Sequence, residues 1–416
     1  MTDVREAEID TGTAYGMKPA TYRQELVEVG PGTPMGELMR RYWQPCALSE
    51  DLGSDKPQKV RLLGENLILF RDKSGRPGLV HENCCHRGTS LYFGRIEEDG
   101  IRCCYHGWKF DVKGNCLEQP AEIDGGRNRA KVRQPWYPVE ERYGLVYAYM
   151  GPPDKKPVLP RWEHLENLGD DEYIETRWKP GYGPLNDDPY NPLKFNFLAA
   201  YENTMDSPHL PWLHYYHSCD QFTGAPLLRH DAEDANLPPY AHIKDLAGQI
   251  VAERSELGVK QGVPMPIPGH GLFLASNEAI IPNMAVVATL IDMLYFVPVD
   301  DTSFISFMLF RTKKGEQRSH LNELHFGKTW WEMSEEEHQR SPGDYEAQFS
   351  IGVLPAHSRE HLSQGDVALG MLRRRLAEAV RDVQEGRDPP GVRRGPDADD
   401  VLRIGAHGMI PYTAAA

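Results

Sequence analysis

The chain has 416 residues, 40% of them hydrophobic and 26% charged, and a formal net charge of −15. This length predicts two or three packed domains of ordinary globular composition, and the negative charge argues against nucleic acid as a partner, because binding phosphates requires a basic face. No apolar run approaches the roughly 20 residues of a membrane span, and segment 1–11 is acidic and polar, unlike a signal peptide, so we expect no membrane association and a cytoplasmic location.

The first part of the chain changes from an irregular leader to short strands. After residues 1–30, the segment Thr33–Trp43 predicts a short helix, because Pro34 stands near its start and apolar residues recur on one face. From about Lys59 to Tyr149, short β-like runs alternate with glycine-rich turns. This alternation predicts a small all-β domain.

The rest of the chain predicts a mixture of helices and strands. Four prolines in Pro152–Pro160 indicate a linker. Leu198–His217 can be helical although prolines interrupt it, Gly271–Arg311 is rich in β-forming residues, and Thr329–Gln339 is helix-like. Asp366–Glu385 predicts an amphipathic helix, with the aspartate at its first position as the expected N-cap.

The most informative segment holds two cysteine–histidine pairs. Four of the seven cysteines lie within 21 residues, and the odd total argues against a disulfide scaffold. Cys84 and His86 form a C-x-H pair and, after sixteen residues, Cys103 and His106 form a C-x-x-H pair. A [2Fe–2S] cluster with two thiolates on one iron and two imidazoles on the other needs this ligand set, and the neutral imidazoles raise its reduction potential.

A structural Cys2His2 zinc site is the alternative for this segment. Zinc sites usually present a cysteine pair followed by a histidine or cysteine pair, whereas cysteine and histidine alternate within each of these loops. Gly88 and Gly107 allow both loops to turn tightly around inorganic sulfide. The pattern therefore favours the iron–sulfur cluster.

The segment Cys84–Trp108 resembles the Rieske motif of aromatic-ring-hydroxylating oxygenases. This resemblance implies that the two cysteine–histidine pairs named above hold the cluster. Cys85 and Cys104 stand where many relatives carry proline or another residue. We expect two inert thiols at these positions, and a disulfide that braces the two loops is the alternative.

A second group of residues has the spacing D-x-x-H-x4-H. Asp206 and His209 are three residues apart and can share a helix face. His214 can reach the same metal if Pro211 reshapes the turn. Two imidazoles and a carboxylate leave positions open for dioxygen on Fe(II). The resemblance to Rieske oxygenases extends here and implies that both histidines bind iron and that Asn203 lies near it. It also implies that Asp206 links cluster and iron across a subunit boundary.

The carboxylate ligand of the iron should come from far along the chain. The residue pattern alone leaves five candidates open: Asp300, Asp301, Glu336, Asp344 and Glu346. Segment 343–362 resembles the C-terminal region of phthalate-dioxygenase-like enzymes, in which the iron-binding aspartate stands eight residues before a glycine. The resemblance therefore implies Asp344, eight residues before Gly352. A helix cap after Pro342 is the alternative role for this aspartate.

The resemblance covers most of the chain and implies an α+β fold. An all-β Rieske domain (46–152) is expected beside a catalytic domain (153–416) with a helix-grip architecture, in which a curved antiparallel sheet surrounds a long helix. The leader and first helix (1–45) are expected to pack with the catalytic domain. The implied assembly is a homotrimer or a hexamer of stacked trimers, with head-to-tail contacts between the cluster of one subunit and the iron of the next.

The expected activity is that of a terminal oxygenase. The sequence has no G-x-G-x-x-G motif after a strand, so electrons from NADH are expected through a separate flavin or ferredoxin reductase. The resemblance implies electron transfer from His106 through Asp206 to His209 and the iron, where O2 would react. An aromatic carboxylate is the expected substrate, for which Arg254 and Arg311 are candidate partners, although surface or structural roles are the simpler expectation for both.

Similarity to dehydrodivanillate O-demethylases favours O-demethylation of a lignin-derived methoxylated biphenyl acid. One alternative is cis-dihydroxylation by a phthalate-type ring dioxygenase. An alternative of another class is a non-catalytic metal-binding protein that only transfers electrons.

Overall fold

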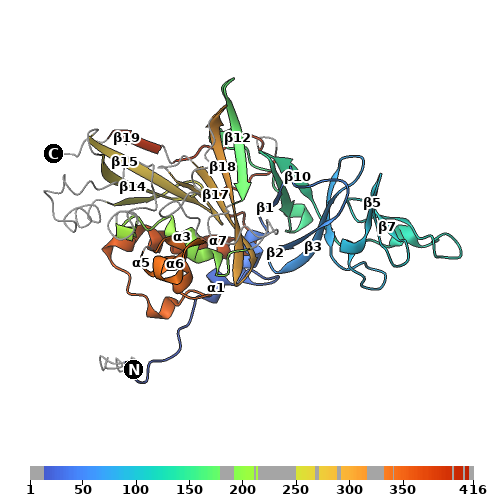
Figure 1. Ribbon diagram of the computed structural model, residues 1–416, viewed down its shortest axis with the longest axis horizontal. Coiled ribbons are helices and arrows are strands. Elements are labelled where there is room, and N and C mark those ends of the chain that lie inside the picture. Colours follow the sequence, from blue (N-terminus) through green and yellow to red (C-terminus); the bar gives the residue numbers. More distant parts are fainter. Residues whose placement is uncertain are drawn as a thin grey trace.

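Two β-rich regions follow one another along the long axis of the computed structural model (Figure 1). One region contains the small sheets of the cluster motif, and the other contains one large sheet with its helices. The structure describes residues 14–178, 192–209, 212–213, 250–267, 271–287, 292–315, 332–340, 342–395, 398–405 and 408–411.

Two four-stranded antiparallel sheets build the region of the cluster motif, with the orders β2-β3-β4-β9 and β5-β6-β7-β8. The prediction of β structure here is confirmed. The strands are β2 (Gln58–Leu62), β3 (Glu65–Arg71), β4 (Pro77–His81), β5 (Arg95–Glu97), β6 (Gly100–Arg102), β7 (Lys109–Phe110), β8 (Cys116–Glu118) and β9 (Trp136–Tyr137). A separate small core lies between the sheets and includes Ile68, Phe70, Ile101 and Phe110, all fully buried.

The start of the chain packs against the larger core. The predicted first helix is confirmed as α2 (Pro34–Met39), with the Thr33 side chain accepting a hydrogen bond from the Gly36 N–H. It is shorter than expected, because Trp43 already begins a strand. The short helix α1 (Gln24–Val27) lies in the segment that was expected to be irregular.

A third sheet joins the two regions. It has the order β1-β11-β10, and the strands are β1 (Trp43–Leu48), β10 (Val139–Arg142) and β11 (Leu145–Tyr149). Every residue of β1 and β11 is buried. These strands therefore belong to the larger hydrophobic core rather than to the small one.

The large sheet is antiparallel and contains eight strands, in the order β12-β18-β17-β16-β15-β14-β13 with β19 paired to β15. The β-rich prediction for this part is confirmed. The strands are β12 (Glu172–Trp178), β13 (Val251–Arg254), β14 (Gly258–Ile267), β15 (Gly271–Ile280), β16 (Met284–Val287), β17 (Asp292–Asp300), β18 (Ser303–Lys313) and β19 (Gly408–Pro411).

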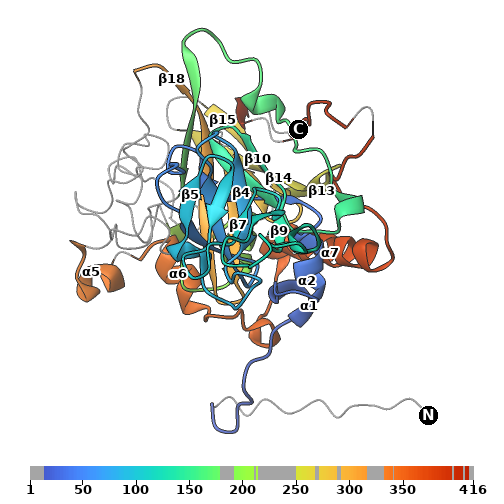
Figure 2. The same ribbon diagram turned by 90° about the vertical axis from the view of Figure 1, so that its right-hand side faces the viewer.

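Helices cover one side of this sheet. They include α3 (Phe197–Asn203), α6 (Asp344–Ser350) and α7 (Val367–Gln384), whereas α5 (Glu335–Arg340) has no buried residue. The long helix α7 packs on β13, β14 and α2, and Figure 2 shows α1, α2 and α7 lying together on one side. Leu372 and Leu376 are fully buried at the predicted helical spacing. The curved sheet with its long helix is the helix-grip architecture that was expected.

Helix ends differ in detail from the prediction. Asp366 stands at the N-cap of α7, but its carboxylate accepts hydrogen bonds from the backbone N–H and hydroxyl of Ser363 instead of capping the helix. The helix expected over Leu198–His217 is interrupted: α3 ends at Asn203, and His209 and residues 212–213 are helical again. Residues 210–211 and 214–217 lie outside the described part. No helix in the described ranges is long and apolar enough to cross a bilayer.

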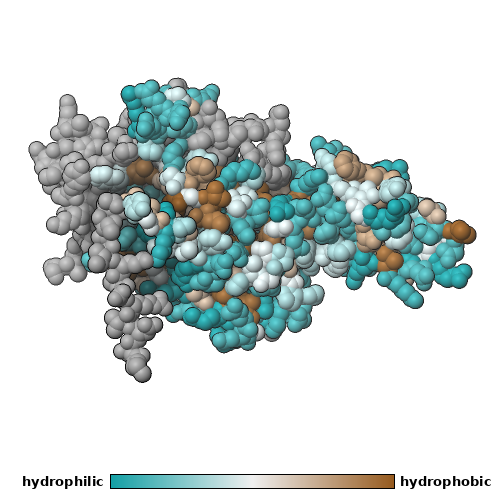
Figure 3. Space-filling view, turned by 90° about the horizontal axis from the view of Figure 1, so that it is seen from below, coloured by the Kyte–Doolittle hydropathy of each residue, from teal (hydrophilic) through white to brown (hydrophobic). Residues whose placement is uncertain are grey.

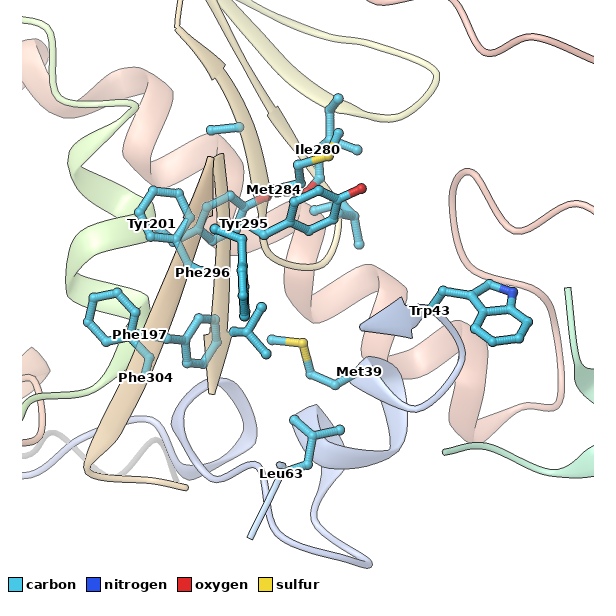
Figure 4. Close-up of a cluster of buried hydrophobic side chains, with 14 of the residues drawn as sticks. Met39, Trp43, Leu63, Phe197, Tyr201, Ile280, Met284, Tyr295, Phe296 and Phe304 are labelled. Atoms are coloured by element: carbon cyan, nitrogen blue, oxygen red, sulfur yellow. Dashed lines mark hydrogen bonds between the residues drawn. The ribbon is translucent and has the colours of Figure 1, made fainter. Parts of the chain in front are cut away.

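The core under α3 is aromatic and fixes this short helix to the sheet. Phe197 and Tyr201 point from α3 toward Phe296 and Phe304 of the large sheet (Figure 4). The Tyr201 hydroxyl donates a 2.8 Å hydrogen bond to the carbonyl oxygen of Ile280. Burial of these large rings stabilises the contact by roughly 1.5–3 kcal/mol for each side chain, and it fixes the position of the end of α3.

Candidate metal centres

Two matching loops carry the cysteine–histidine pairs. In the first, the Gly88 N–H donates to the Cys84 carbonyl oxygen (2.8 Å), and in the second the Gly107 N–H donates to the Cys103 carbonyl oxygen (3.1 Å). Both glycines have positive φ, 80° and 73°, so they provide the tight turns that the sequence predicted. A Cβ at Gly107 would also lie 2.7 Å from Pro120 Cγ.

The loops bring all four predicted cluster residues together. Cys84 and Cys103 are each 3% exposed, and burial, with the interacting Cys103 thiol adding to it, raises the pKa of Cys84 to about 12. The imidazole rings of His86 and His106 are half-buried, and their centroids are 4.5 Å apart. Partial burial and the second ring lower the pKa of His86, which favours its neutral, ligating form.

The surroundings of the loops fit an iron–sulfur cluster. The Trp108 indole stacks on His86 at 4.3 Å, and its buried N–H has no hydrogen-bond partner among the described residues. Such an N–H costs about 1–3 kcal/mol unless an acceptor is present, and inorganic sulfide is an acceptor. Within the described ranges, no three His, Cys, Asp or Glu side chains converge on a single ion, whereas two irons need only two protein ligands each.

Cys85 and Cys104 are exposed, free thiols, so the alternative of a disulfide between them is wrong. The buried Gln134 side chain braces the first loop instead. Its oxygen accepts the Cys85 N–H at 2.8 Å, and its nitrogen donates to the carbonyl oxygens of His81 (2.8 Å) and Asn83 (2.9 Å). No motif marks Gln134, because all its partners are backbone groups.

An ion network braces the second loop. Arg102 donates to the Gly107 carbonyl oxygen and to Glu118, both at 2.7 Å, and forms two hydrogen bonds with Glu97. Lys109, 7% exposed, also forms an ion pair with Glu118. The Arg102 guanidinium, against a smaller opposing effect of burial, lowers the pKa of Glu97 to about 2.

The second group of predicted residues meets at the end of α3. The Asn203 amide nitrogen lies 3.2 Å from Asp344 Oδ1 and 3.2 Å from His209 Nε2. The same His209 and Asp344 atoms are 3.5 Å apart. Asp344 is the first residue of α6, so α3 and α6 jointly form this site. His214, the other predicted histidine, lies outside the described residues.

The geometry of His209 fits a metal ligand. Its Nδ1 makes a short contact with the Asp206 carbonyl oxygen, and an Nδ1–H that donates there leaves Nε2 as an acceptor. This acceptor then faces the carboxylate of Asp344, and both side chains are mostly buried, at 16% and 20% exposure. A divalent cation could bind between these two groups, and a neutral N donor with an anionic O donor and open positions suits Fe(II).

Comparison with known proteins decides the family. A model of the Rieske [2Fe-2S] domain matches residues 42–130. Over 403 residues the chain is 43% identical to the phenoxybenzoate dioxygenase subunit alpha of Ectopseudomonas oleovorans, covering 94% of this chain and 93% of that protein. The chain belongs to the Rieske oxygenase family, as a terminal oxygenase subunit.

Two further relatives are similar over nearly the whole chain. It is 34% identical to the tert-butanol monooxygenase / tert-amyl alcohol desaturase oxygenase subunit of Aquincola tertiaricarbonis, covering 91% of this chain and 81% of that protein. It is 31% identical to the 5,5'-dehydrodivanillate O-demethylase oxygenase subunit of Sphingobium sp. (strain NBRC 103272 / SYK-6), covering 93% and 86%.

The fold agrees with this assignment. A crystal structure of dicamba monooxygenase bound to dicamba superposes with a TM-score of 0.58 at 17% identity, covering 84% of this chain and 99% of that chain. The oxygenase therefore combines a Rieske domain that carries a [2Fe–2S] cluster with a catalytic domain of the Rieske oxygenase type.

Asp206 lies beside His209 at the edge of the second candidate metal site. Its carboxylate is 33% exposed and lies 4.0 Å from His209 Nδ1. Burial, with Asp366 and Asp344 nearby, raises the pKa of Asp206, against the opposing effect of His209. The carboxylate therefore lies close to the histidine and still reaches the surface.

Two strand residues that the sequence analysis did not single out support the end of α3. Gln261 and Asn277 are register partners on β14 and β15. Their amide nitrogens donate to the Thr204 carbonyl oxygen at 3.1 and 3.3 Å. In the sequence, these two residues are marked only as polar side chains within β-rich segments. Many surface positions have the same pattern, so it does not identify a supporting role.

The two candidate arginines for a substrate carboxylate have other partners. Arg254 forms an ion pair with Glu378 at 2.6 Å, and Arg311 forms one with Glu172 at 2.5 Å. Arg254 is 55% exposed. Both arginines therefore have the surface and structural roles that were the simpler expectation.

Proposed function

We propose that this oxygenase receives electrons from NADH through a separate reductase and uses O2 to oxygenate a carboxylated aryl ether. The observation that carries this proposal is the convergence of Asn203, His209 and Asp344 at the end of α3, in a chain whose other region pairs two cysteines with two histidines. A protein that only transfers electrons would not need the second site.

In the Rieske domain we assign one iron to Cys84 and Cys103 and the other iron to His86 and His106. When bound, such a cluster accepts and passes one electron at a time. The buried thiols lose their protons on ligation, and the half-buried imidazoles remain at the surface, where a partner protein can approach.

In the catalytic domain we assign the mononuclear iron to His209, His214 and Asp344. When bound, Fe(II) with three protein ligands offers open positions at which O2 meets the substrate. Asn203 donates to Asp344 and lies against His209, so it orients both side chains. The Asp206 carbonyl oxygen accepts a hydrogen bond from His209 Nδ1 in this assignment and so fixes the tautomer of the imidazole. The Asp206 carboxylate is a separate group, and we propose that it faces a neighbouring subunit.

We further propose a homotrimer, alone or stacked as a hexamer, in which His106 of one copy lies beside Asp206 of the next. The two candidate metal centres lie toward opposite ends of the long axis of one chain (Figure 1). Tyr92, Phe93 and Tyr105 are 42%, 66% and 57% exposed near the cluster loops. Figure 3 shows hydrophobic surface both on the narrow cluster end and over the wider end. Exposed apolar residues around α6 and α7 complete the proposed contact: Phe349, Ile351, Val353, Leu362 and Val367.

The names of the relatives support the substrate class. Phenoxybenzoate and dehydrodivanillate are both aromatic acids with an ether oxygen on the ring. The higher identity to the phenoxybenzoate enzyme, 43% against 31%, favours dioxygenation of a phenoxybenzoate-like acid over the O-demethylation that the sequence resemblance favoured. O-demethylation is the second candidate, and the relative named for tert-butanol supplies a non-aromatic comparison compound.

A single-turnover experiment tests the proposal without a known reductase. Protein loaded with iron and sulfide is reduced with dithionite and exposed to ¹⁸O₂ with phenoxybenzoate, dehydrodivanillate or tert-butanol. We expect a phenoxybenzoate product with two labelled oxygen atoms. Formaldehyde and a phenol from dehydrodivanillate would establish O-demethylation instead.

Two variants serve as controls in this experiment. Asp344→Asn should lose product formation, whereas Glu336→Gln, on the exposed helix α5, should retain it. A protein that is fully reduced and reoxidised by O2 but forms no product from either aromatic acid would contradict the proposed function.

A further inference from the structure

We propose that Arg373 of α7 is a positioning residue for the catalytic iron site, and that it acts by holding Glu202, the residue before Asn203. The inference rests on the proposed function, because it concerns the same iron site. It adds a residue that touches none of the proposed iron ligands in the described contacts.

The contact between Arg373 and Glu202 is buried and two-pronged. Nε of Arg373 donates to Glu202 Oε1 at 2.6 Å, and Nη2 donates to Oε2 at 2.7 Å. The two side chains are only 8% and 7% exposed. A planar guanidinium fixes both the distance and the rotation of a carboxylate in this geometry, so α7 holds the last turn of α3 in one orientation.

A second carboxylate fixes Arg373 from the other side. Glu360 accepts hydrogen bonds from Nη1 and, at 2.9 Å, from Nη2 of the same guanidinium. The segment that carries Glu360 is itself tied to the start of the chain. There, the Ser358 N–H donates to the Thr21 carbonyl oxygen at 3.0 Å, and the Arg23 N–H donates to His357 Nδ1 at 2.9 Å. The guanidinium therefore lies between Glu360 and Glu202, and the position of α7 and of the Glu360 segment determines the position of α3.

The position of α3 matters because its end has little room to adjust. The helix has seven residues, and Phe197 to Glu202 are all buried. Asn203 follows directly and contacts both His209 and Asp344 at 3.2 Å. A rotation of the last turn of α3 would move the Asn203 amide relative to both proposed ligands. Outer partners of metal ligands typically change metal affinity by about 10- to 100-fold when they are removed.

Three variants test how each contact of Arg373 affects the candidate iron site. Arg373→Lys keeps the charge but loses the two-pronged contact, Glu202→Gln keeps the shape but loses the charge, and Glu360→Gln leaves the Arg373–Glu202 contact intact. Arg374→Lys is the matched control, because Arg374 is the neighbouring residue of α7 and is exposed. The measurements are the Fe(II) dissociation constant of the mononuclear site, the visible spectrum of the cluster and the melting temperature.

We expect Fe(II) to dissociate about 10-fold more readily from Arg373→Lys and Glu202→Gln than from the wild-type protein, with an unchanged cluster spectrum. Glu360→Gln should have a smaller effect, and Arg374→Lys none. A lower melting temperature with wild-type Fe(II) affinity in the folded Arg373→Lys and Glu202→Gln proteins would overturn the inference and leave only a structural role. Failure of the wild-type protein to bind Fe(II) at this site would instead count against the proposed function.

Discussion

The two candidate metal centres are built in different ways. The cluster residues come from two loops that are neighbours in the sequence, between β4 and β7, and each loop is closed by its own backbone hydrogen bonds. The candidate iron site joins Asn203 to Asp344, which are 141 residues apart. A change within one cluster loop should therefore affect the cluster alone, whereas the candidate iron site depends on how α3, α6, α7 and the sheet pack together.

Loss of a single cluster ligand should abolish activity and leave the candidate iron site intact. Cys103→Ser should remove the cluster, because one iron loses one of its two thiolates. The visible absorption and all turnover should disappear, while Fe(II) still binds at the catalytic site. Absorption spectra with iron and sulfide analysis check this outcome. Loss of Fe(II) binding at the catalytic site in the same variant would show that the centres are not independent.

Asp206→Asn tests the link between the centres. The cluster spectrum and Fe(II) binding should remain, and turnover should fall by about 100-fold, because the carboxylate at the edge of the site is lost while the backbone contact to His209 is kept. Asp366→Asn, a nearby carboxylate with a partner in its own turn, is the control. Steady-state turnover at wild-type level in Asp206→Asn would refute the linking role.

Asn203→Ala tests whether the amide between His209 and Asp344 affects the candidate iron site alone. The variant loses the amide between His209 and Asp344, so Fe(II) affinity should fall by about 10-fold. The cluster potential should not change. Metal titration and a redox titration measure the two quantities, and a shift of the potential without a change in iron affinity would contradict the assignment.

The ion network beside the second cluster loop should make a small, pH-dependent contribution to stability. Arg102 lowers the pKa of Glu97 from 4.5 to about 2, so the stabilisation is complete above pH 4.5 and is lost as the pH falls toward 2. Glu97→Gln should therefore lower the free energy of unfolding at pH 7 by about 1 kcal/mol, since the pair is partly open to water, and by less at pH 3.

Denaturation of the metal-free chain by urea at both pH values measures this difference without interference from the acid lability of a cluster. Glu98→Gln is the matched control, because Glu98 is exposed and adjacent. If Glu97→Gln lowers the free energy of unfolding equally at pH 7 and pH 3, the charge of Glu97 contributes nothing to stability.

The same contrast explains what could be predicted from the sequence. Local spacing was enough to predict that Cys84, His86, Cys103 and His106 come together, because their two loops need little beyond adjacent glycines to converge. Asp344 was implied only by a family resemblance, since no local pattern brings residues 203 and 344 together. The roles of these residues as ligands remain predictions, as does that of His214, which lies outside the described residues.

Supporting residues were beyond sequence reasoning for a physical reason. Gln134 binds backbone groups of three residues, and Arg373 binds carboxylates 171 and 13 residues away. Such contacts leave no periodic trace in the sequence. Secondary structure was predicted well where hydrophobic periodicity was strong, as in α7, and helix ends were less accurate. The domain boundaries after residues 45 and 152 remain predictions, and the first falls inside β1.

In the proposed homotrimer, activity depends on protein concentration, because the two candidate metal centres of one chain lie apart along its long axis. The cluster of an isolated subunit could be reduced, but that subunit would form no product. Specific activity should therefore rise with protein concentration and level off once assembly is complete. Two dead variants, Cys103→Ser and His209→Ala, should then regain turnover when their subunits are mixed, because each intact cluster can meet an intact iron site across a boundary. Genetic complementation between alleles of a single gene would be the corresponding observation in a cell.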